Sequence, residues 1–384
     1  MIAPTLPKLL LPLILILALP TPAQTAPAPN PGREAQRVEW PLLTGDVWLM
    51  IGDTANRARM DDLAAAALAR YPRGGFVIRR SLAVGNTYPA AVDRLLHETT
   101  QWKPSLLTVD LGMTDCVSWY PHSLDFLTNP GSPLKALLDS TREANQRLFL
   151  VSPSAWDDLP AGLDRPVLEE FLRKVHGFTM LNNLPYLDVY APAQAIGLPP
   201  GGIDAGATAQ LLDAAMIFKA MGADGLVSSV EIDAGNGKLI RSERATVSDI
   251  HCTGASLRFQ RLDESLPFPV PPDARAALRA SGSTLLGSPQ NLFGMSRYEL
   301  TVQGLPPGRY RLSIDGQVVA TVTSSELEGG YGAGLLDRGP VYDQGQQLLA
   351  AVKGADGTPA SDKITHDAAT PKPHIWSLKL DETN

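Results

Sequence analysis

Val47-Trp-Leu-Met-Ile-Gly-Asp-Thr54 is an apolar run that ends abruptly in Gly-Asp-Thr. An apolar run of this length, bounded by turn residues, predicts a buried strand of a parallel sheet. Residues 56–71 follow directly, are rich in Ala and Arg, and predict a helix. A strand, a tight turn and a helix would hold the side chain of Thr54 at the carboxyl edge of a sheet, where α/β proteins bind their ligands.

Strand-like and helix-like segments alternate from residue 45 to residue 222. The predicted strands are 47–51, 76–80, 106–111, 147–152 and 186–190. The predicted helices are 57–70, 89–101, 133–146, 165–181 and 206–221. Strands that alternate with helices of this length indicate a parallel sheet with helices on both faces. Five strands fit a flavodoxin-like, doubly wound α/β domain over residues 45–222.

The pattern changes after Gly222, where short segments of strand character replace the helices. Two of them, 310–314 and 318–322, alternate apolar and polar residues on either side of Asp315-Gly316, which is a strong signal for a β-hairpin. The other predicted strands are 227–232, 238–241, 256–262 and 297–302. We therefore expect a smaller all-β, sandwich-like module over residues 223–353.

The last part of the chain is less regular. Residues 340–352 have helical character within the β-rich module. Residues 354–384 are polar and contain Gly, so we expect a polar tail, with a late strand at 375–380.

The N-terminus has the pattern of a targeting segment. Lys8 precedes an apolar stretch at 9–19, and Thr21-Pro-Ala23 offers small residues for cleavage. This pattern predicts a signal peptide over 1–23, with a membrane anchor as the alternative, and export to the periplasm, cell envelope or medium. The Pro- and Ala-rich residues that follow predict a linker over 24–44. No second apolar run of about 18 residues occurs, so no further membrane span is expected.

Composition excludes some classes of function. The 384 residues carry a net charge of -7 and no long basic run, which argues against a nucleic-acid partner. No cluster of Cys or His has the spacing of a metal site, so neither a metal nor a cofactor is expected. The two cysteines, Cys116 and Cys252, could pair in an exported protein, or remain free.

Four short blocks between residues 45 and 222 resemble, in order, the conserved blocks of the SGNH (GDSL-type) ester hydrolases. They are Ile51-Gly-Asp-Thr54, Arg79-Arg-Ser-Leu-Ala-Val-Gly85-Asn-Thr87, Val109-Asp-Leu-Gly-Met-Thr114-Asp115 and Gly202-Ile-Asp204-Ala-Gly-Ala207. The β-rich region beyond residue 222 is similar to the extension of secreted bacterial members, notably at 262–267 and 305–316. The resemblance implies an ester hydrolase lineage, acting on acyl esters of carbohydrates or lipids.

The resemblance also implies a role for each matched position. Thr54 stands where the family has its serine nucleophile, and Gly85 and Thr114 stand at the two oxyanion positions. Asp204 stands at the position of the orienting acid, and Ala207 at the position of the histidine base. Only the glycine is kept, because serine, asparagine and histidine have become Thr54, Thr114 and Ala207.

These departures have different chemical consequences. Thr54 keeps a hydroxyl, although its β-branched side chain is stiff about χ1. Thr114 can still donate one hydrogen bond, from a shorter group. Ala207 cannot accept a proton, and without a base a hydroxyl is a poor nucleophile near neutral pH. We therefore expect a protein with impaired catalysis.

Other residues have two interpretations each. His122, in a loop after the third block, is either a substitute base or ligand contact or an exposed histidine, and Trp119 either lines a ligand groove or belongs to the local core. Asp204 could persist as a helix N-cap. Asp53 and Asp115 are expected to be turn and capping residues. Arg79 and Arg80 are expected to be solvated.

Three functions remain open from the sequence. The first is an exported SGNH-like pseudoenzyme that binds an acylated glycan or another ester-like ligand. The second is an active esterase that uses Thr54 with an unforeseen base such as His122. The third is a structural protein of the cell envelope.

Overall fold

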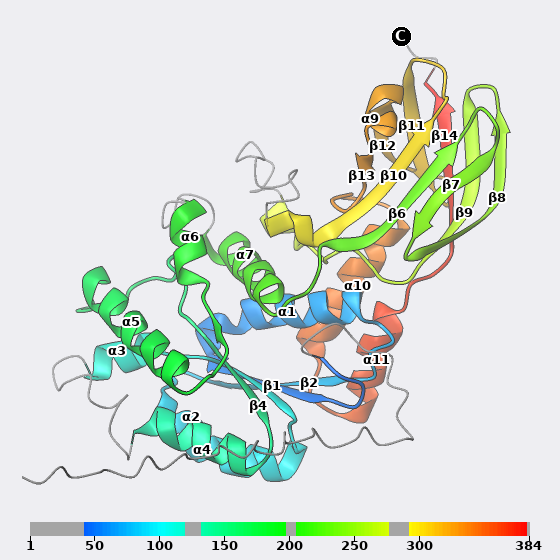
Figure 1. Ribbon diagram of the computed structural model, residues 1–384. Helices are drawn as coiled ribbons and strands as arrows, with labels where there is room; N and C mark the ends of the chain where they lie inside the picture. The colour runs from blue at the N-terminus through cyan, green and yellow to red at the C-terminus, as the bar shows by residue number, and fades with distance from the viewer. Residues whose placement is uncertain (1–41, 120–131, 197–204, 276–291, 382–384) are drawn as a thin grey trace, which may run out of the picture. The chain divides into compact units, whose positions relative to one another are not determined.

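The computed structural model describes residues 42–119, 132–196, 205–275 and 292–381 (Figure 1). Its first part is a five-stranded parallel sheet in the order β2-β1-β3-β4-β5. The strands are β1 Val47–Asp53, β2 Val77–Ala83, β3 Leu106–Asp110, β4 Arg147–Val151 and β5 Tyr186–Leu187. This order is that of a flavodoxin-like, doubly wound sheet, so the predicted fold class is confirmed.

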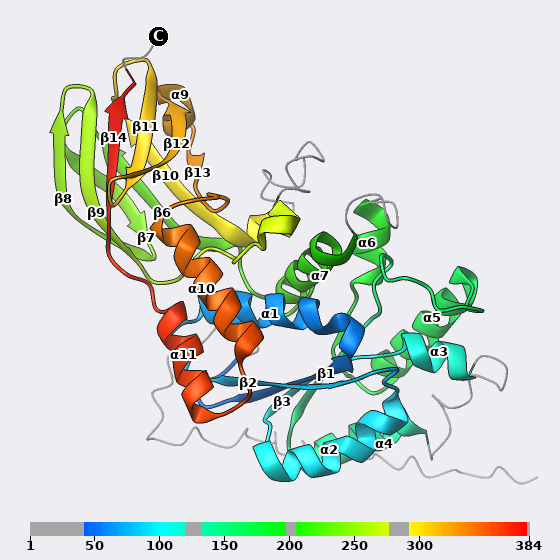
Figure 2. The same cartoon turned by 180° about the vertical axis from the view of Figure 1, so that it is seen from behind.

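Helices cover both faces of this sheet. They are α1 Arg57–Arg70, α2 Tyr88–Trp102, α3 Met113–Trp119, α4 Pro133–Glu143, α5 Arg165–Leu181, α6 Tyr190–Ile196 and α7 Ala205–Ala220. Helices α2 and α4 lie on one face, and α1 lies on the other, where it packs against α7 (Figures 1 and 2). Because the chain leaves β1 toward β2 and later crosses back to β3, helices α1 and α2 fall on opposite faces and a crevice opens beyond the carboxyl ends of β1 and β3.

Local sequence explains where several helices begin. The Thr87 side chain accepts the N–H of Ala90 ahead of α2, and the Ser132 side chain accepts the N–H of Lys135 ahead of α4. A proline follows each cap in the first turn, where its missing N–H costs nothing.

The second part of the chain is a β-sandwich, as the sequence predicts. Its strands are β6 Leu226–Asp233, β7 Lys238–Glu243, β8 Ala245–Thr253, β9 Ser256–Asp263, β10 Arg297–Gln303, β11 Arg309–Ile314, β12 Gln317–Thr323, β13 Tyr331–Gly332 and β14 His374–Leu380. They form one sheet in the order β13-β10-β6-β7 and another in the order β12-β11-β14-β9-β8. Tyr298, Tyr310 and Trp376 are buried in the single apolar core that the two sheets share.

The hairpin prediction is confirmed in detail. Strands β11 and β12 pair antiparallel through Asp315-Gly316, whose φ angles are 49° and 83°. Positive φ at both central residues is the mark of a type I′ turn, whose twist suits a two-residue hairpin. Within strand β8, the sequence indicates strand character only at Asp249-Ile-His251, because β8 is a largely exposed edge strand with a register shift between Ser248 and His251.

The end of the chain corrects the expectation of a polar tail over 354–384. After α9 Ser324–Glu328, helix α10 Pro340–Gly354 packs against α1, and α11 Pro359–Ala369 packs against α10 (Figure 2). Strand β14 then lies inside the five-stranded sheet, between β11 and β9, where the late strand was expected at 375–380. Helix α11 escapes prediction because it buries only a narrow stripe, Thr365 and Ala369, on the rest of the fold.

The expectation that Arg79 and Arg80 are solvated is also corrected, because both side chains are held by surrounding helices. Two nitrogens of Arg79 each lie 2.7 Å from a carboxylate oxygen of Asp362 in α11. Arg80 pairs with Asp61 of α1 and donates to the carbonyl oxygens of Val352 and Ala355. Arg79 and Arg80 of β2 therefore attach α11 and the end of α10 to the parallel sheet.

The remaining sequence expectations concern the N-terminal segment, further membrane spans and the two cysteines. The predicted signal peptide over 1–23 and the predicted linker as far as residue 41 lie outside the described residues. Within the described ranges no helix has both the length and the apolarity to cross a bilayer. Cys116, buried in α3, and Cys252, half-buried in β8, are both free thiols.

Candidate functional site

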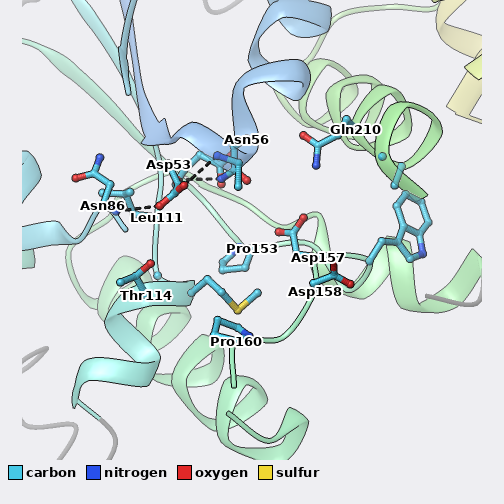
Figure 3. Close-up of a pocket in the computed structure, with 17 residues that line it drawn as sticks. Asp53, Asn56, Asn86, Leu111, Thr114, Pro153, Asp157, Asp158, Pro160 and Gln210 are labelled. Carbon is cyan, nitrogen blue, oxygen red and sulfur yellow. Dashed lines mark hydrogen bonds between the residues drawn. The ribbon is translucent and has the colours of Figure 1, made fainter. Parts of the chain in front are cut away.

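A pocket of about 390 Å³ opens at the carboxyl ends of β1, β3 and β4 (Figure 3). It is lined by Asp53, Ala55, Asn56, Asn86, Asp110, Leu111, Gly112, Met113, Thr114, Pro153, Trp156, Asp157, Asp158, Pro160, Gly206, Ala209 and Gln210. Figure 3 shows Asp53, Asn86 and Thr114 on one side and Asp157, Asp158 and Gln210 on the other. This is the crevice where a doubly wound sheet binds its ligands.

The first two sequence blocks meet through Asp53. One carboxylate oxygen of Asp53 accepts the N–H of Ala55 at 2.9 Å and so caps the short turn after β1. The other oxygen accepts the N–H of Asn86 at 2.9 Å. The Asn86 side chain in turn donates to the carbonyl oxygen of Gly52, also at 2.9 Å. The expected role of Asp53 as a turn residue is confirmed, and it also fixes the second block against the first.

The expected nucleophile and glycine positions lie at the edge of this pocket. Thr54 is exposed, and its hydroxyl donates to Asp53 Oδ1 at 3.3 Å. Thr54 is not among the lining residues, although its neighbours Asp53 and Ala55 are. Gly85 is also exposed and adopts φ of 60°, and the pocket is reached by the next residue, Asn86.

Thr114 and Ala207 approach the pocket from two helices. Thr114 lies in the first turn of α3 and lines the pocket directly. Ala207 lies half-buried in the first turn of α7, next to Gly206, which lines the pocket. Asp204 and His122 lie outside the described residues, as does the side chain of Trp119.

Asp115 has the capping role that the sequence predicts, on a neighbouring helix. It is fully buried, and its carboxylate accepts the N–H of Tyr88, at the start of α2, at 3.0 Å. Burial raises the pKa of Asp115 to about 7, against the opposing effect of the hydrogen bond from Tyr88.

A buried charge cluster lies behind the pocket, and the sequence analysis missed it. Arg59 of α1 is completely buried, and its Nε lies 2.9 Å from Asp110 Oδ2 at the end of β3. Arg59 Nη1 donates to Asp213 Oδ2 of α7 at 2.9 Å, and Nη2 lies 3.7 Å from Asp157 Oδ2. Ser154 donates to the second oxygen of Asp213 at 2.9 Å. One guanidinium thus joins a sheet strand, two helices and the loop after β4.

Burial and the neighbouring charges shift the proton affinities of this cluster. Burial raises the pKa of Asp110 to about 7, although Arg59 opposes the shift. Burial likewise raises the pKa of Asp213. Burial alone would lower the pKa of Arg59, but Asp110, Asp157 and Asp213 outweigh it and hold that pKa above its usual value. Arg59 is therefore always charged, and Asp110 and Asp213 are the groups of the cluster that titrate.

A local signal for this cluster does exist in the sequence. Asp213 stands within Leu211-Leu-Asp-Ala-Ala-Met-Ile-Phe218, where every neighbour is apolar. A single carboxylate inside a buried helical stripe needs a cation, because an unpaired buried charge is very unfavourable. Its partner, 154 residues earlier in the chain, cannot be read from that pattern.

The lining defines what the pocket can do chemically. No Lys, Arg, His or Cys occurs among the described residues that line it. The Thr114 hydroxyl, the Asp158 carboxylate and the indole N–H of Trp156 have no hydrogen-bond partner within the described ranges. The described residues also contain no group of three His, Cys, Asp or Glu side chains arranged to hold a metal ion.

Comparison with known proteins gives structural likenesses only. No family model matches the chain, and no curated protein matches it. BT4096, a gut microbial diltiazem-metabolizing enzyme, matches with a TM-score of 0.70 and 16% identity, over 89% of this chain and 99% of its own. Axe2, an acetylxylan esterase from Geobacillus stearothermophilus, matches with a TM-score of 0.40 and 18% identity, over 47% of this chain and 95% of its own. A protein named as a GDSL-like lipase, from Parabacteroides merdae, matches with a TM-score of 0.41 and 18% identity, over 48% of this chain and 99% of its own.

The first likeness extends over both the α/β part and the β-sandwich, since it covers 89% of this chain. In this chain the sheet order is β2-β1-β3-β4-β5, and the first three sequence blocks lie at the carboxyl ends of its strands. The chain therefore has a doubly wound α/β domain joined to a β-sandwich, and it shares this fold with BT4096.

Proposed function

We propose that this protein is an exported SGNH/GDSL-fold protein that binds an acylated glycan or a similar ester-like ligand and has lost most or all of its hydrolytic activity. The observation that carries the proposal is the composition of the pocket, which no described histidine, lysine or cysteine lines. Ala207, at the position that the resemblance assigns to the base, has no group that accepts a proton.

Impaired catalysis follows from the lack of a base beside Thr54. The nearest acceptor is Asp53, whose carboxylate already accepts the N–H groups of Ala55 and Asn86. Both oxygens of that carboxylate are therefore engaged in holding the turn after β1 and the start of the second block. In a serine hydrolase, loss of triad members costs about 10⁴–10⁶ in turnover. Replacement of one oxyanion donor, as at Thr114, costs about 10²–10³ more.

Binding remains chemically reasonable because the pocket keeps groups that suit a hydroxyl-rich ligand. Asp158 can accept hydrogen bonds from sugar hydroxyls. The Thr114 hydroxyl can both accept and donate hydrogen bonds. Leu111 and Met113 add apolar surface, so the pocket has the mixed lining of a small-molecule site.

Hydrolysis is the first test. The purified protein is incubated with p-nitrophenyl acetate beside a Thr54→Ala variant, and release of p-nitrophenol is followed. We expect the two proteins to give the same slow rate. A clearly higher rate that disappears in Thr54→Ala would overturn the proposal in favour of an active esterase.

The second test measures binding by calorimetry. It compares acetylated xylo-oligosaccharides with the same oligosaccharides after deacetylation. We expect binding of the acetylated ligand that weakens about tenfold in Asp158→Ala. The matched control is Asp139→Ala, an exposed carboxylate on α4 away from the pocket. Absence of binding to either oligosaccharide would favour a structural role.

Export is tested separately. The N-terminal 23 residues are fused to a reporter that is active only outside the cytoplasm, and the full protein is located by cell fractionation. Activity of the reporter is expected, together with loss of those residues from the mature chain.

A further inference from the structure

A groove of about 670 Å³ lies on the outer face of the five-stranded sheet of the β-sandwich. It is lined by His251, Thr253, Ser256, Leu257, Arg258, Asp315, Gly316, Ile375, Ser377, Leu378 and Lys379. These residues come from β8, β9 and β14 and from the turn between β11 and β12. The groove is separate from the pocket of the α/β domain and shares no lining residue with it.

The strand register gathers cations on this face. Arg258 of β9 lies between His251 of β8 and Ser377 of β14. In the next row, Lys379 of β14 lies directly opposite Arg311 of β11. Neighbouring strands are about 4.8 Å apart, so these side chains are close enough to contact one ligand together.

Most of this positive charge has no partner in the protein. Within the described ranges, Arg258, Lys379 and His251 make no ion pair and no side-chain hydrogen bond, and all three are exposed. Arg311 has a distant partner, since its Nε lies 3.7 Å from Asp381. Like charges directly opposite one another on neighbouring strands are destabilising. An anion bound beside Lys379 would relieve the repulsion between Lys379 and Arg311.

Among the described residues that line the groove, the one carboxylate is that of Asp315, and it is already engaged. One oxygen of Asp315 lies 2.7 Å from His374 Nδ1, and the other accepts the N–H of Ile375 at 2.7 Å. Asp315 thus marks one end of the groove without neutralising Arg258 or Lys379.

Hydroxyl groups rather than aromatic rings accompany these cations. Ser256, Ser377 and Thr253 line the groove, and the Ser256 and Thr253 hydroxyls lie 2.8 Å apart. No aromatic ring other than His251 lines the groove within the described residues, because the side chains of Phe259 and Trp376 face the sandwich core. Single-stranded nucleic acid needs stacking platforms, and a membrane surface needs exposed aromatic or apolar groups, which here amount to Ile375 at 37% exposure.

We infer that this face binds an anionic polysaccharide whose sugars carry carboxylates. Arg258, Lys379 and Arg311 pair with uronate carboxylates, and Ser256, Ser377 and Thr253 hydrogen-bond to the sugar hydroxyls. The site is independent of the function proposed for the α/β pocket and needs no catalysis.

The experiment uses the full chain and oligogalacturonate in calorimetry at low and at physiological salt. We expect binding that weakens as salt rises, because the charges are exposed. The double variant Arg258→Gln, Lys379→Gln should bind about tenfold more weakly or worse. Its melting temperature should equal or exceed that of the parent, since Lys379→Gln removes the repulsion with Arg311; this outcome excludes misfolding as the cause of lost binding.

The matched control is Lys238→Gln, Arg241→Gln, which removes two charges from β7 in the other sheet. It should bind like the parent. The inference is overturned if oligogalacturonate does not bind, if the two double variants lose affinity equally, or if neutral xylo-oligosaccharide competes as well as oligogalacturonate. Preference for single-stranded DNA or for anionic lipid vesicles over oligogalacturonate would also overturn it.

Discussion

Arg59 Nη1 donates a hydrogen bond to Asp213 Oδ2 at 2.9 Å, and neither side chain is exposed to solvent. The bond joins α1, which follows the Gly-Asp-Thr turn, to α7, which carries Gly206 and Gln210 into the pocket. Gln210 adds a second link, because its side-chain oxygen accepts the N–H of Arg59 at 3.1 Å. Two walls of the pocket are therefore fixed by one arginine behind it.

Arg59→Met should destabilise the protein by about 3–5 kcal/mol at pH 8, because it leaves Asp110 and Asp213 buried without a cation. The loss should shrink at pH 5, where both carboxylates, whose pKa values are raised by burial, are protonated. Urea unfolding at the two pH values measures both effects. The control is Arg57→Met, whose side chain is 59% exposed and which should change stability by less than about 0.5 kcal/mol. Equal losses in the two variants would show that the cluster has no special role.

Asp62→Asn should make the protein less sensitive to alkaline pH. Asp62 of α1 is 2% exposed, and burial raises its pKa from an ordinary 3.8 to about 7. The charge of Lys353 lowers that pKa but does not cancel the effect of burial. A carboxyl whose pKa is raised on folding stabilises the fold below its unfolded pKa and loses that contribution as pH rises through about 7. Asparagine cannot ionise, so the stability gained by the variant should grow by about 2–3 kcal/mol between pH 5 and pH 8.

Urea unfolding at these two pH values checks this prediction. Asp93→Asn, at an exposed position on α2, provides the comparison and should show no such trend. A variant at position 62 that gains the same stability at both pH values would contradict the burial argument.

The triple variant Thr54→Ser, Thr114→Asn, Ala207→His should gain esterase activity. It restores the three residue types that the resemblance implies, at positions beside the pocket. A gain of about 10²-fold over the parent is expected on p-nitrophenyl acetate, a fraction of what a complete triad provides. The same variant with Thr54→Ala in place of serine should be inactive. A folded but inert triple variant would mean that the residues are assigned to the wrong positions.

The two cysteines should react separately. Cys252 is half-buried and Cys116 is fully buried, and burial raises the pKa of the Cys116 thiol to about 11. Ellman's reagent at pH 8 should therefore modify Cys252 in the folded protein and leave Cys116 unreactive. Both thiols should react in guanidinium chloride without a reductant, and Cys252→Ser should abolish the reaction of the folded protein. Fewer than two reactive thiols in guanidinium would reveal a disulfide.

Asp362→Ala should loosen α11. It removes the partner of Arg79, whose side chain is only 10% exposed, so a cost of about 1–3 kcal/mol is expected. Limited proteolysis should cut within residues 355–373 faster than in the parent, since α11 loses its ion pair with the sheet strand β2. Asp367→Ala, at an exposed position of the same helix, should behave like the parent. Cleavage at an unchanged rate would place the stability of α11 in its apolar stripe instead.

The sequence by itself determined the parallel sheet, its edge and the location of the pocket. The run from Val47 to Ile51 can only be satisfied by burial on both faces, and Gly52-Asp53 ends it at a tight turn, so the carboxyl edge follows from local pattern. The hairpin at Asp315-Gly316 is equally local, because the turn type needs only two residues that tolerate positive φ.

Only the tertiary structure decided which distant charges meet. Arg59 and Asp213 lie 154 residues apart, Arg79 and Asp362 lie 283 apart, and Lys379 faces Arg311 only because β14 pairs with β11. Each of these relationships depends on strand order and helix packing, and not on the neighbours of either residue in the chain. Periodicity reports which face of an element is buried, whereas the partner of a buried or clustered charge is chosen by the whole fold.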